Sequence, residues 1–184
     1  MNVHTPENKG SFPSEHHACV GPNAVLQLVG VLREQEEKNL AERVFAAADL
    51  TFLLYRPPKS MIDERIPKRL FDTLWTELPT DRAGHIARES GKRTADYVMA
   101  TRIPVLVRYI FRITPPWLAS LLLLKAIERN AWTFAGSGTC STRWQPKATI
   151  SIKNNPLAMH DCLWHIAVFE QMFKSLVSPA TTVI

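Results

Sequence analysis

Histidine is the side chain through which this sequence could bind a metal most readily, because a neutral imidazole nitrogen is a common metal ligand. His165 stands in a predicted helix four residues before Phe169, and His85 stands in another, four residues before Glu89. His160 precedes the last predicted helix and is a weaker candidate. Each position has an ordinary alternative: His165 as a core histidine bonded to a backbone carbonyl, and His85 as the surface partner of Glu89. The spacing leaves both interpretations open.

The sequence offers no recognisable site for an electron-carrying cofactor. Gly136-Ser137-Gly138 comes nearest to the dinucleotide motif GxGxxG, but a third glycine is missing and no predicted helix follows, so we predict a turn. The cysteines Cys19, Cys140 and Cys162 have no CxxC spacing and are too few for an iron–sulfur centre with four cysteine ligands. We predict that Cys140 and Cys162 are small, buried, apolar residues in a reducing compartment. A flavin site has no universal signature and stays open.

The chain is mildly basic, with a formal net charge of +5. This charge fits an anionic partner: a carboxylated small molecule, an acidic protein face or an anionic membrane surface. We predict no nucleic-acid binding, because no dense basic stripe or recognition motif is present. Arg108 and Arg112 are the most suggestive cations, since they stand four residues apart in an otherwise apolar segment. Solvated basic residues are the default alternative.

Helical periodicity dominates the first two thirds of the chain. Gly21-Pro22-Asn23 opens a helix that ends in the charged run 33–38, and a shorter apolar stripe follows at residues 40–48. Asp63 caps the next predicted helix and Pro79 stops it. Thr80 or Asp81 caps another helix, which runs to about Arg102. Two apolar helices are predicted over 105–113 and 117–129. Small side chains along residues 83–98 allow close approach, either of a planar ring or of another helix.

The pattern then changes to alternation. Residues 131–136 and 147–153 predict two strands joined by a loop at 136–146, and Asn154-Asn155-Pro156 predicts a turn. Residues 162–177 predict a last helix with Phe169 and Phe173 on its inner stripe. Several helices, a small antiparallel sheet and a C-terminal helix predict an α/β domain of the α+β kind.

The 184 residues suit one domain. We predict a disordered or loosely attached arm over residues 1–21, a single ligand-binding domain over 22–178 and a tail over 179–184. The most apolar segment, residues 117–127, is too short to span a membrane, and the N-terminus lacks the apolar core of a signal peptide. We therefore predict a cytoplasmic protein and leave a peripheral contact with a membrane open.

Three segments together resemble one known family. They are "RAGHIARESGKRTADYVMATRIP" (82–104), "LLLKAIERNAWTFAGSG" (122–138) and "NPLAMHDCLWHIAVFEQMFKSLV" (155–177). The set resembles the BchJ family, named bacteriochlorophyll 4-vinyl (8-vinyl) reductase, over residues 21–178. The resemblance implies the 4-vinyl reductase domain fold, related to TRAPP subunits and haem-nitric-oxide sensor domains. It also implies bacteriochlorophyll biosynthesis in a photosynthetic bacterium.

The resemblance further implies a magnesium tetrapyrrole as ligand: a flat, apolar macrocycle with a central metal and a carboxylate at its rim. Such a ligand needs an axial donor, aromatic walls and a cation. Either His165 or His85 is the predicted axial ligand to magnesium. The remaining predicted binding residues are Trp164, Phe169, Trp132, Arg108 and Arg112.

Three functions compete at this point. We favour a protein that binds a divinyl protochlorophyllide or chlorophyllide type of intermediate, has no intrinsic cofactor, and presents or carries the pigment to bacteriochlorophyll biosynthesis enzymes. The first alternative is a divinyl chlorophyllide 8-vinyl reductase that uses an external reductant, as the family name implies. The second is an interaction module that dimerises through the apolar helix at 117–127. We also predict a homodimer.

Overall fold

The computed structural model describes residues 18–144, 147–158 and 160–183, and within them it is a small α+β fold, as predicted. The helices are α1 (Asn23–Arg33), α2 (Leu40–Ala47), α3 (Phe52–Tyr55), α4 (Arg65–Glu77), α5 (Thr80–Arg102), α6 (Val105–Ile113), α7 (Pro116–Arg129) and α8 (Leu163–Leu176). The strands are β1 (Cys19–Val20), β2 (Ile62–Asp63), β3 (Thr139–Arg143) and β4 (Thr149–Lys153). Two short 3₁₀ turns are η1 (Ala131–Thr133) and η2 (His160–Cys162).

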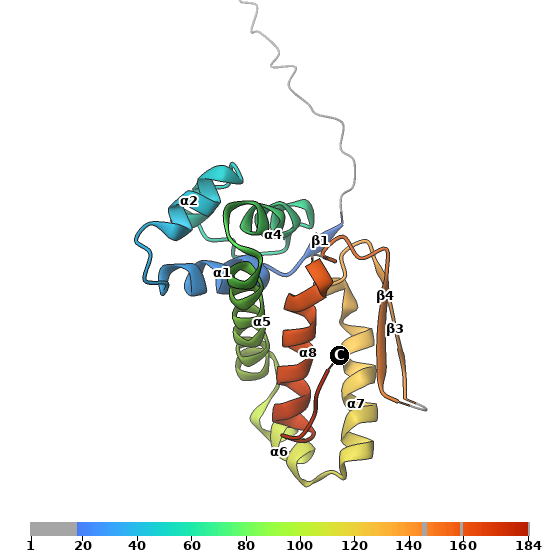
Figure 1. The fold of residues 1–184 in the computed structure, drawn as a ribbon. Coiled ribbons are helices and arrows are strands. Elements are labelled where there is room, and N and C mark those ends of the chain that lie inside the picture. Colours follow the sequence, from blue (N-terminus) through green and yellow to red (C-terminus); the bar gives the residue numbers. More distant parts are fainter. Residues whose placement is uncertain (1–17, 145–146, 159, 184) are drawn as a thin grey trace, which may run out of the picture.

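Helix α8 occupies the middle of the molecule, between α5 and α7 (Figure 1). The antiparallel hairpin β3–β4 covers the far side of α7, and α1, α2 and α4 gather around the N-terminal half of α5. Helix α6 lies at the opposite end, where the chain turns back from α5 into α7 (Figure 1). The last helix is therefore packed on two sides, and most of its buried side chains join the main core.

The helices follow the predicted periodicity closely. The 40–48 stripe is buried in α2, Leu70 and Leu74 are buried in α4, and α5 ends at Arg102 as predicted. The N-cap residue of α4 is Glu64 rather than the predicted Asp63, although Asp63 Oδ1 accepts a hydrogen bond from the Arg65 backbone N–H at 2.9 Å. The predicted cap of α5 is wrong: Pro79 is the N-cap residue and no side chain caps the helix. Proline has no side-chain oxygen that could accept a hydrogen bond from the first turn, and its fixed φ leads the chain into the helix without a capping hydroxyl.

The first predicted strand of the hairpin is wrong in position. Residues 131–136 form the turn η1 and a bend that includes Gly136 at φ +55°, whereas the strand lies at Thr139–Arg143, inside the predicted loop. The second strand and the turn after it are confirmed, since β4 pairs with β3 and Asn154 takes a left-handed φ of 52°. In β3 no side chain is fully buried, and exposed residues alternate with half-buried ones. Pairing with β4 therefore determines the position of this strand more than the hydrophobicity of its own residues does.

The N-terminal boundary also differs from the prediction. Residues 1–17 of the predicted arm lie outside the described residues, but its last residues belong to the folded part. Cys19 and Val20 form β1 and pair with Asp63 and Ile62 of β2, and Val20 is buried. The Gly21 backbone N–H donates to the Thr133 carbonyl at 2.7 Å. This start of the fold is thus anchored against η1, and the predicted arm boundary at residue 21 does not hold for residues 19–21.

Close approach between α5 and α8 explains the small side chains of α5. A Cβ placed on Gly91 would lie 2.5 Å from the Trp164 carbonyl oxygen and 2.9 Å from the Ala167 Cβ. A Cβ on Gly84 would lie 3.1 Å from Leu163 Cδ1. Of the two alternatives at this face, the structure shows helix packing: the backbone of α8 fills the space that a planar ring would need.

We predict that Gly91→Ala destabilises the protein, because the added methyl group has no room against α8. Helix propensity alone would favour alanine by about 1 kcal/mol, but overpacking costs about 1–3 kcal/mol and exceeds that gain. Gly30→Ala in α1 is the matched control, since its nearest new contact would be Arg93 Nη1 at 3.9 Å. Urea unfolding should show a lower midpoint for Gly91→Ala and an equal or higher one for Gly30→Ala. Equal effects of the two substitutions would contradict this account of the α5–α8 contact.

Candidate functional site

His165 is buried at the start of α8 inside a cluster of aromatic rings. Only 3% of the residue is exposed. Its ring lies 4.8 Å from the ring of Trp164, 6.2 Å from that of Phe169 and 6.3 Å from that of Phe134, measured between centroids. Phe71 of α4 extends the cluster, with its ring 6.3 Å from that of Trp164. The structure therefore brings together three of the predicted binding residues, His165, Trp164 and Phe169.

One hydrogen bond fixes the tautomer of His165. Its Nε2 lies 3.3 Å from the Phe134 carbonyl oxygen. A carbonyl oxygen only accepts, so the proton of the neutral ring stands on Nε2 and Nδ1 carries a bare lone pair. Metal-bound histidines commonly donate the other ring N–H to a backbone carbonyl in this way. The orientation predicted for a core histidine is thus also the orientation of a metal ligand.

Two buried nitrogens of the aromatic cluster lack a hydrogen-bond partner within the described part of the chain. Among the described residues, three buried side-chain nitrogens lack a hydrogen-bond partner: Arg108 Nε, Trp164 Nε1 and His165 Nδ1. All three belong to residues singled out from the sequence. Buried polar atoms are nearly always partnered, and an ordered water or a bound ligand can serve those that the chain itself leaves unpaired. Two of the three are adjacent in sequence, on Trp164 and His165.

Burial keeps the His165 ring neutral. It lowers the pKa of His165 to about 4, because the charged imidazolium would lose its hydration, and the hydrogen bond to Phe134 offsets only part of that loss. The ring is therefore uncharged at neutral pH and is available as a lone-pair donor.

The other predicted residues lie apart from this cluster. His85 is exposed on α5, and Trp132 is 59% exposed on η1, two residues before Phe134. Arg108 and Arg112 are on α6, which contacts α8 at the end of the molecule away from η1 (Figure 1). The 14 residues of α8 span about 20 Å at 1.5 Å per residue. The predicted axial donor and the predicted cations therefore stand near opposite ends of α8.

Sequence reasoning missed the segment that leads into the cluster. Asp161 and Cys162 both take left-handed conformations, with φ of 59° and 54°, directly before α8. Aspartate tolerates this region better than most residues, whereas cysteine has no such preference. Nothing in the sequence marks these positions, because neither is glycine. His160 belongs to the same turn, η2.

The cysteines and the glycine turn behave as ordinary structure. Cys140 and Cys162 are half-buried rather than buried as predicted, and this partial burial raises the pKa of both thiols, which disfavours the reactive thiolate. Gly136 approaches Glu64 closely, and Glu64 accepts hydrogen bonds from the backbone N–H of Ser137 at 2.6 Å and from its hydroxyl at 2.9 Å. These hydrogen bonds hold the turn before β3 against the start of α4. The glycines therefore form a structural turn.

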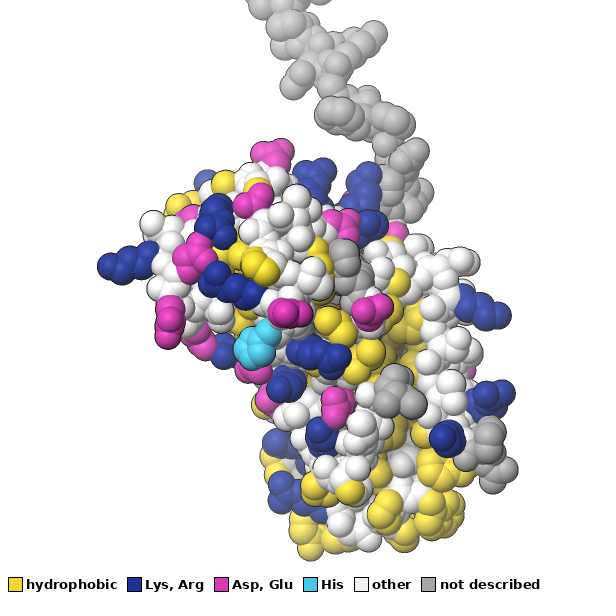
Figure 2. All heavy atoms as spheres, in the orientation of Figure 1, with side chains coloured by type: hydrophobic (Ala, Val, Ile, Leu, Met, Phe, Trp, Pro, Cys, Tyr) yellow, Lys and Arg dark blue, Asp and Glu magenta, His cyan; other side chains and the backbone are white. Residues whose placement is uncertain are grey.

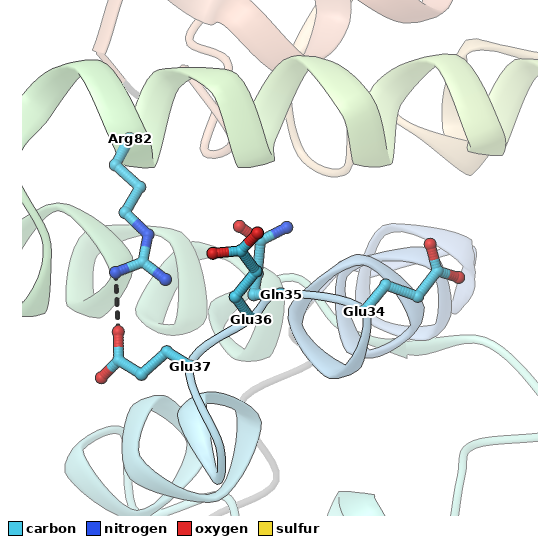
Figure 3. Close-up of a pocket in the computed structure, with 5 residues that line it drawn as sticks. All are labelled: Glu34, Gln35, Glu36, Glu37 and Arg82. Carbon is cyan, nitrogen blue, oxygen red and sulfur yellow. Dashed lines mark hydrogen bonds and ion pairs between the residues drawn. The ribbon is translucent and has the colours of Figure 1, made fainter.

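An open polar crevice lies between α5 and the segment that follows α1 (Figure 3). Its lining is Glu34, Gln35, Glu36, Glu37 and Arg82. Arg82 Nη1 donates to Glu37 Oε2 at 2.6 Å, and Arg93 donates to both oxygens of Glu34 at 2.6 and 2.5 Å. The hydrogen bond from Arg82 is the main reason that the pKa of Glu37 is lowered. This acidic, self-paired lining does not suit an apolar anionic ligand.

Two curated proteins resemble the chain over nearly its full length. One is the bacteriochlorophyll synthase 23 kDa chain of Cereibacter sphaeroides, 35% identical over 100% of this chain and 89% of its own. The other is the bacteriochlorophyll synthase 23 kDa chain of Rhodobacter capsulatus, 34% identical over 93% of this chain and 81% of its own.

The chain belongs to the family of the bacteriochlorophyll synthase 23 kDa chain.

Membership of the 23 kDa chain family confirms the bacteriochlorophyll pathway that the resemblance implied. The name says nothing of vinyl reduction or of pigment carriage, and the narrower BchJ family stays a prediction. No protein-family model and no solved structure matches the chain, so the likeness to TRAPP subunits and haem sensors also stays a prediction. In the described part of the chain, no helix combines the length and apolar character needed to cross a membrane.

The lowered pKa of His165 predicts a pH-dependent stability. Between pH 6.5 and 4 the unfolded chain binds a proton on this ring that the folded chain does not bind. The free energy of unfolding should therefore decrease as the pH is lowered from 6.5 to 4, by up to about 3 kcal/mol from this residue. His165→Gln, which keeps a donor for Phe134, should remove that part of the slope in urea unfolding at pH 7 and pH 4. His85→Gln should keep the wild-type slope, and equal slopes for wild type and His165→Gln would contradict the assignment.

Proposed function

We propose that this chain binds a magnesium tetrapyrrole intermediate of bacteriochlorophyll synthesis and presents it to the enzymes of the pathway. The observation that carries the proposal is His165, a neutral ring with a bare Nδ1 lone pair inside an aromatic cluster, oriented through Nε2 by a backbone carbonyl. Family membership supplies the pathway, because both relatives are named for bacteriochlorophyll synthesis. A divinyl protochlorophyllide or chlorophyllide is the ligand class proposed.

The donor set fits such a pigment. His165 Nδ1 would take the axial position on magnesium, and Trp164 Nε1, a donor without a partner, would donate to an oxygen at the pigment rim. Phe134 and Phe169, whose rings are 5.4 Å apart, would pack against the macrocycle. Magnesium prefers oxygen ligands, but a single imidazole suffices where four pyrrole nitrogens already surround the metal. The pigment supplies the metal, and the chain supplies orientation and shelter from water.

Binding requires that the cluster open, because Trp164 and His165 are only 4% and 3% exposed. The segment most suited to move is η2, whose residues Asp161 and Cys162 hold left-handed conformations next to these rings. Non-glycine residues in such conformations cost about 1 kcal/mol or more each, and a displaced η2 would release that cost. We therefore propose that the pigment enters by displacing η2 from the start of α8.

The direct test is titration of the purified full chain with divinyl protochlorophyllide, followed by the Soret band. Wild type should bind and shift the band, and His165→Gln should bind at least about tenfold more weakly because the axial donor is lost. His85→Gln is the matched control and should bind as wild type. Loss of binding in His85→Gln with retention in His165→Gln would move the axial ligand to the exposed histidine and contradict the proposal.

A second arm separates presentation from catalysis. The chain is mixed anaerobically with the divinyl pigment and NADPH, and the pigment is then analysed by mass. Bound pigment recovered with its 8-vinyl group intact supports presentation. Conversion to the 8-ethyl product by the chain alone would establish the reductase instead. An absence of any spectral shift, in a chain that forms an oligomer, would favour the interaction module.

A further inference from the structure

The apolar side of helix α6 is exposed to solvent. None of its nine residues is buried. Its side chains include some of the most exposed large hydrophobic groups of the described chain: Val105 at 71%, Leu106 at 69%, Ile113 at 67% and Tyr109 at 59%. A surface helix ordinarily directs its apolar stripe to the core and its polar side to water. In α6 that arrangement is reversed.

The reversal follows from the helical spacing. At 3.6 residues per turn, Val105, Leu106, Tyr109, Ile110 and Ile113 fall within one arc of about 140°. Phe111 falls outside the arc and packs against the core. Arg108 and Arg112 fall on the border of the arc, next to Val105. The helix is therefore amphipathic, with a continuous apolar face toward solvent.

The apolar face continues onto the next helix. Trp117 and Leu122 of α7 are 58% and 46% exposed, and α7 begins with Pro115 as its N-cap, two residues after the end of α6. Figure 2 shows hydrophobic side chains gathered at the end of the molecule that carries α6 and the start of α7. We call this set the α6 surface: Val105, Leu106, Tyr109, Ile110, Ile113 and Trp117. A contiguous exposed apolar patch of this kind marks an interaction site.

The charges along α6 and the segments that flank it in the sequence have one sign. Residues 97–124 contain Arg102, Arg108 and Arg112, and no aspartate or glutamate. The next cation, Lys125, is paired with Glu128. Within the described residues, neither Arg108 nor Arg112 forms an ion pair, and Arg102 is exposed. An apolar face bordered by unpaired cations, with tyrosine and tryptophan among its side chains, complements the interface of an anionic membrane.

We propose that the α6 surface docks the protein on an anionic lipid bilayer. The helix would lie in the plane of the interface, with its apolar arc among the acyl chains and Arg112 at the level of the lipid phosphates. A second copy of the chain fits less well, because a symmetric contact would bring these arginines together with no carboxylate from residues 97–127 to pair with them. The proposal is independent of pigment binding at His165.

Vesicle co-sedimentation of the full chain tests the docking. The chain should bind vesicles of phosphatidylcholine mixed with phosphatidylglycerol, bind pure phosphatidylcholine far less, and release as salt is raised. Leu106→Asp should weaken binding at least about tenfold, because it places a charge in the apolar arc. Arg112→Gln should weaken it about fivefold, the effect expected for one cation near an anionic surface.

Matched substitutions elsewhere keep the test specific. Tyr55→Asp on α3 changes a residue that is 75% exposed, and Lys59→Gln removes an exposed cation outside the α6 surface. Both should bind the mixed vesicles as wild type, and all four variants should keep the wild-type melting temperature, since none of the changed residues is buried. Equal losses in Tyr55→Asp and Leu106→Asp would overturn the proposal. So would a dimer that Leu106→Asp converts to monomer, in a chain that binds neither kind of vesicle.

Discussion

The close contact between α5 and α8 is the constraint on which the rest of the structure depends. Gly91 leaves room for the Trp164 carbonyl, so the backbone of α8 lies directly against α5. This contact holds the first turn of α8 inside the core, and with it the rings of Trp164 and His165. The low pKa of His165 follows from that burial, and its tautomer follows from the hydrogen bond to the Phe134 carbonyl. A larger residue at position 91 would separate the helices and hydrate the histidine.

The helices could be predicted because their signals are local. Apolar spacing and prolines stand within a few residues of the helices that they determine. The hairpin shows the limit of such signals. Residues 131–136 carry the residue types of a strand, yet Gly136 must turn with φ +55° beside Glu64, a partner 72 positions away. The strand β3 forms instead at residues 139–143, where pairing with β4 decides the conformation.

The candidate site was predictable in its residues but not in its geometry. The sequence gives reasons to select His165, Trp164 and Phe169, since they share one helix. The partner that orients His165 is the carbonyl of Phe134, and a backbone oxygen leaves no trace in residue type. The same holds for the left-handed residues Asp161 and Cys162. The cations were assigned to the same site because spacing along the sequence cannot show that α8 separates α6 from the aromatic cluster.

This separation has a consequence for how a pigment carrier would work. With α6 on a bilayer and His165 near the far end of α8, the proposed pigment site would stand roughly 15–20 Å from the lipid, given 1.5 Å per helical residue. A pigment there could not pass directly into the acyl chains. It would have to be taken by a partner that reaches η2 and the start of α8. Docking would then concentrate the carrier at the membrane while keeping the pigment exchange between proteins, which agrees with presentation to an enzyme rather than release into lipid.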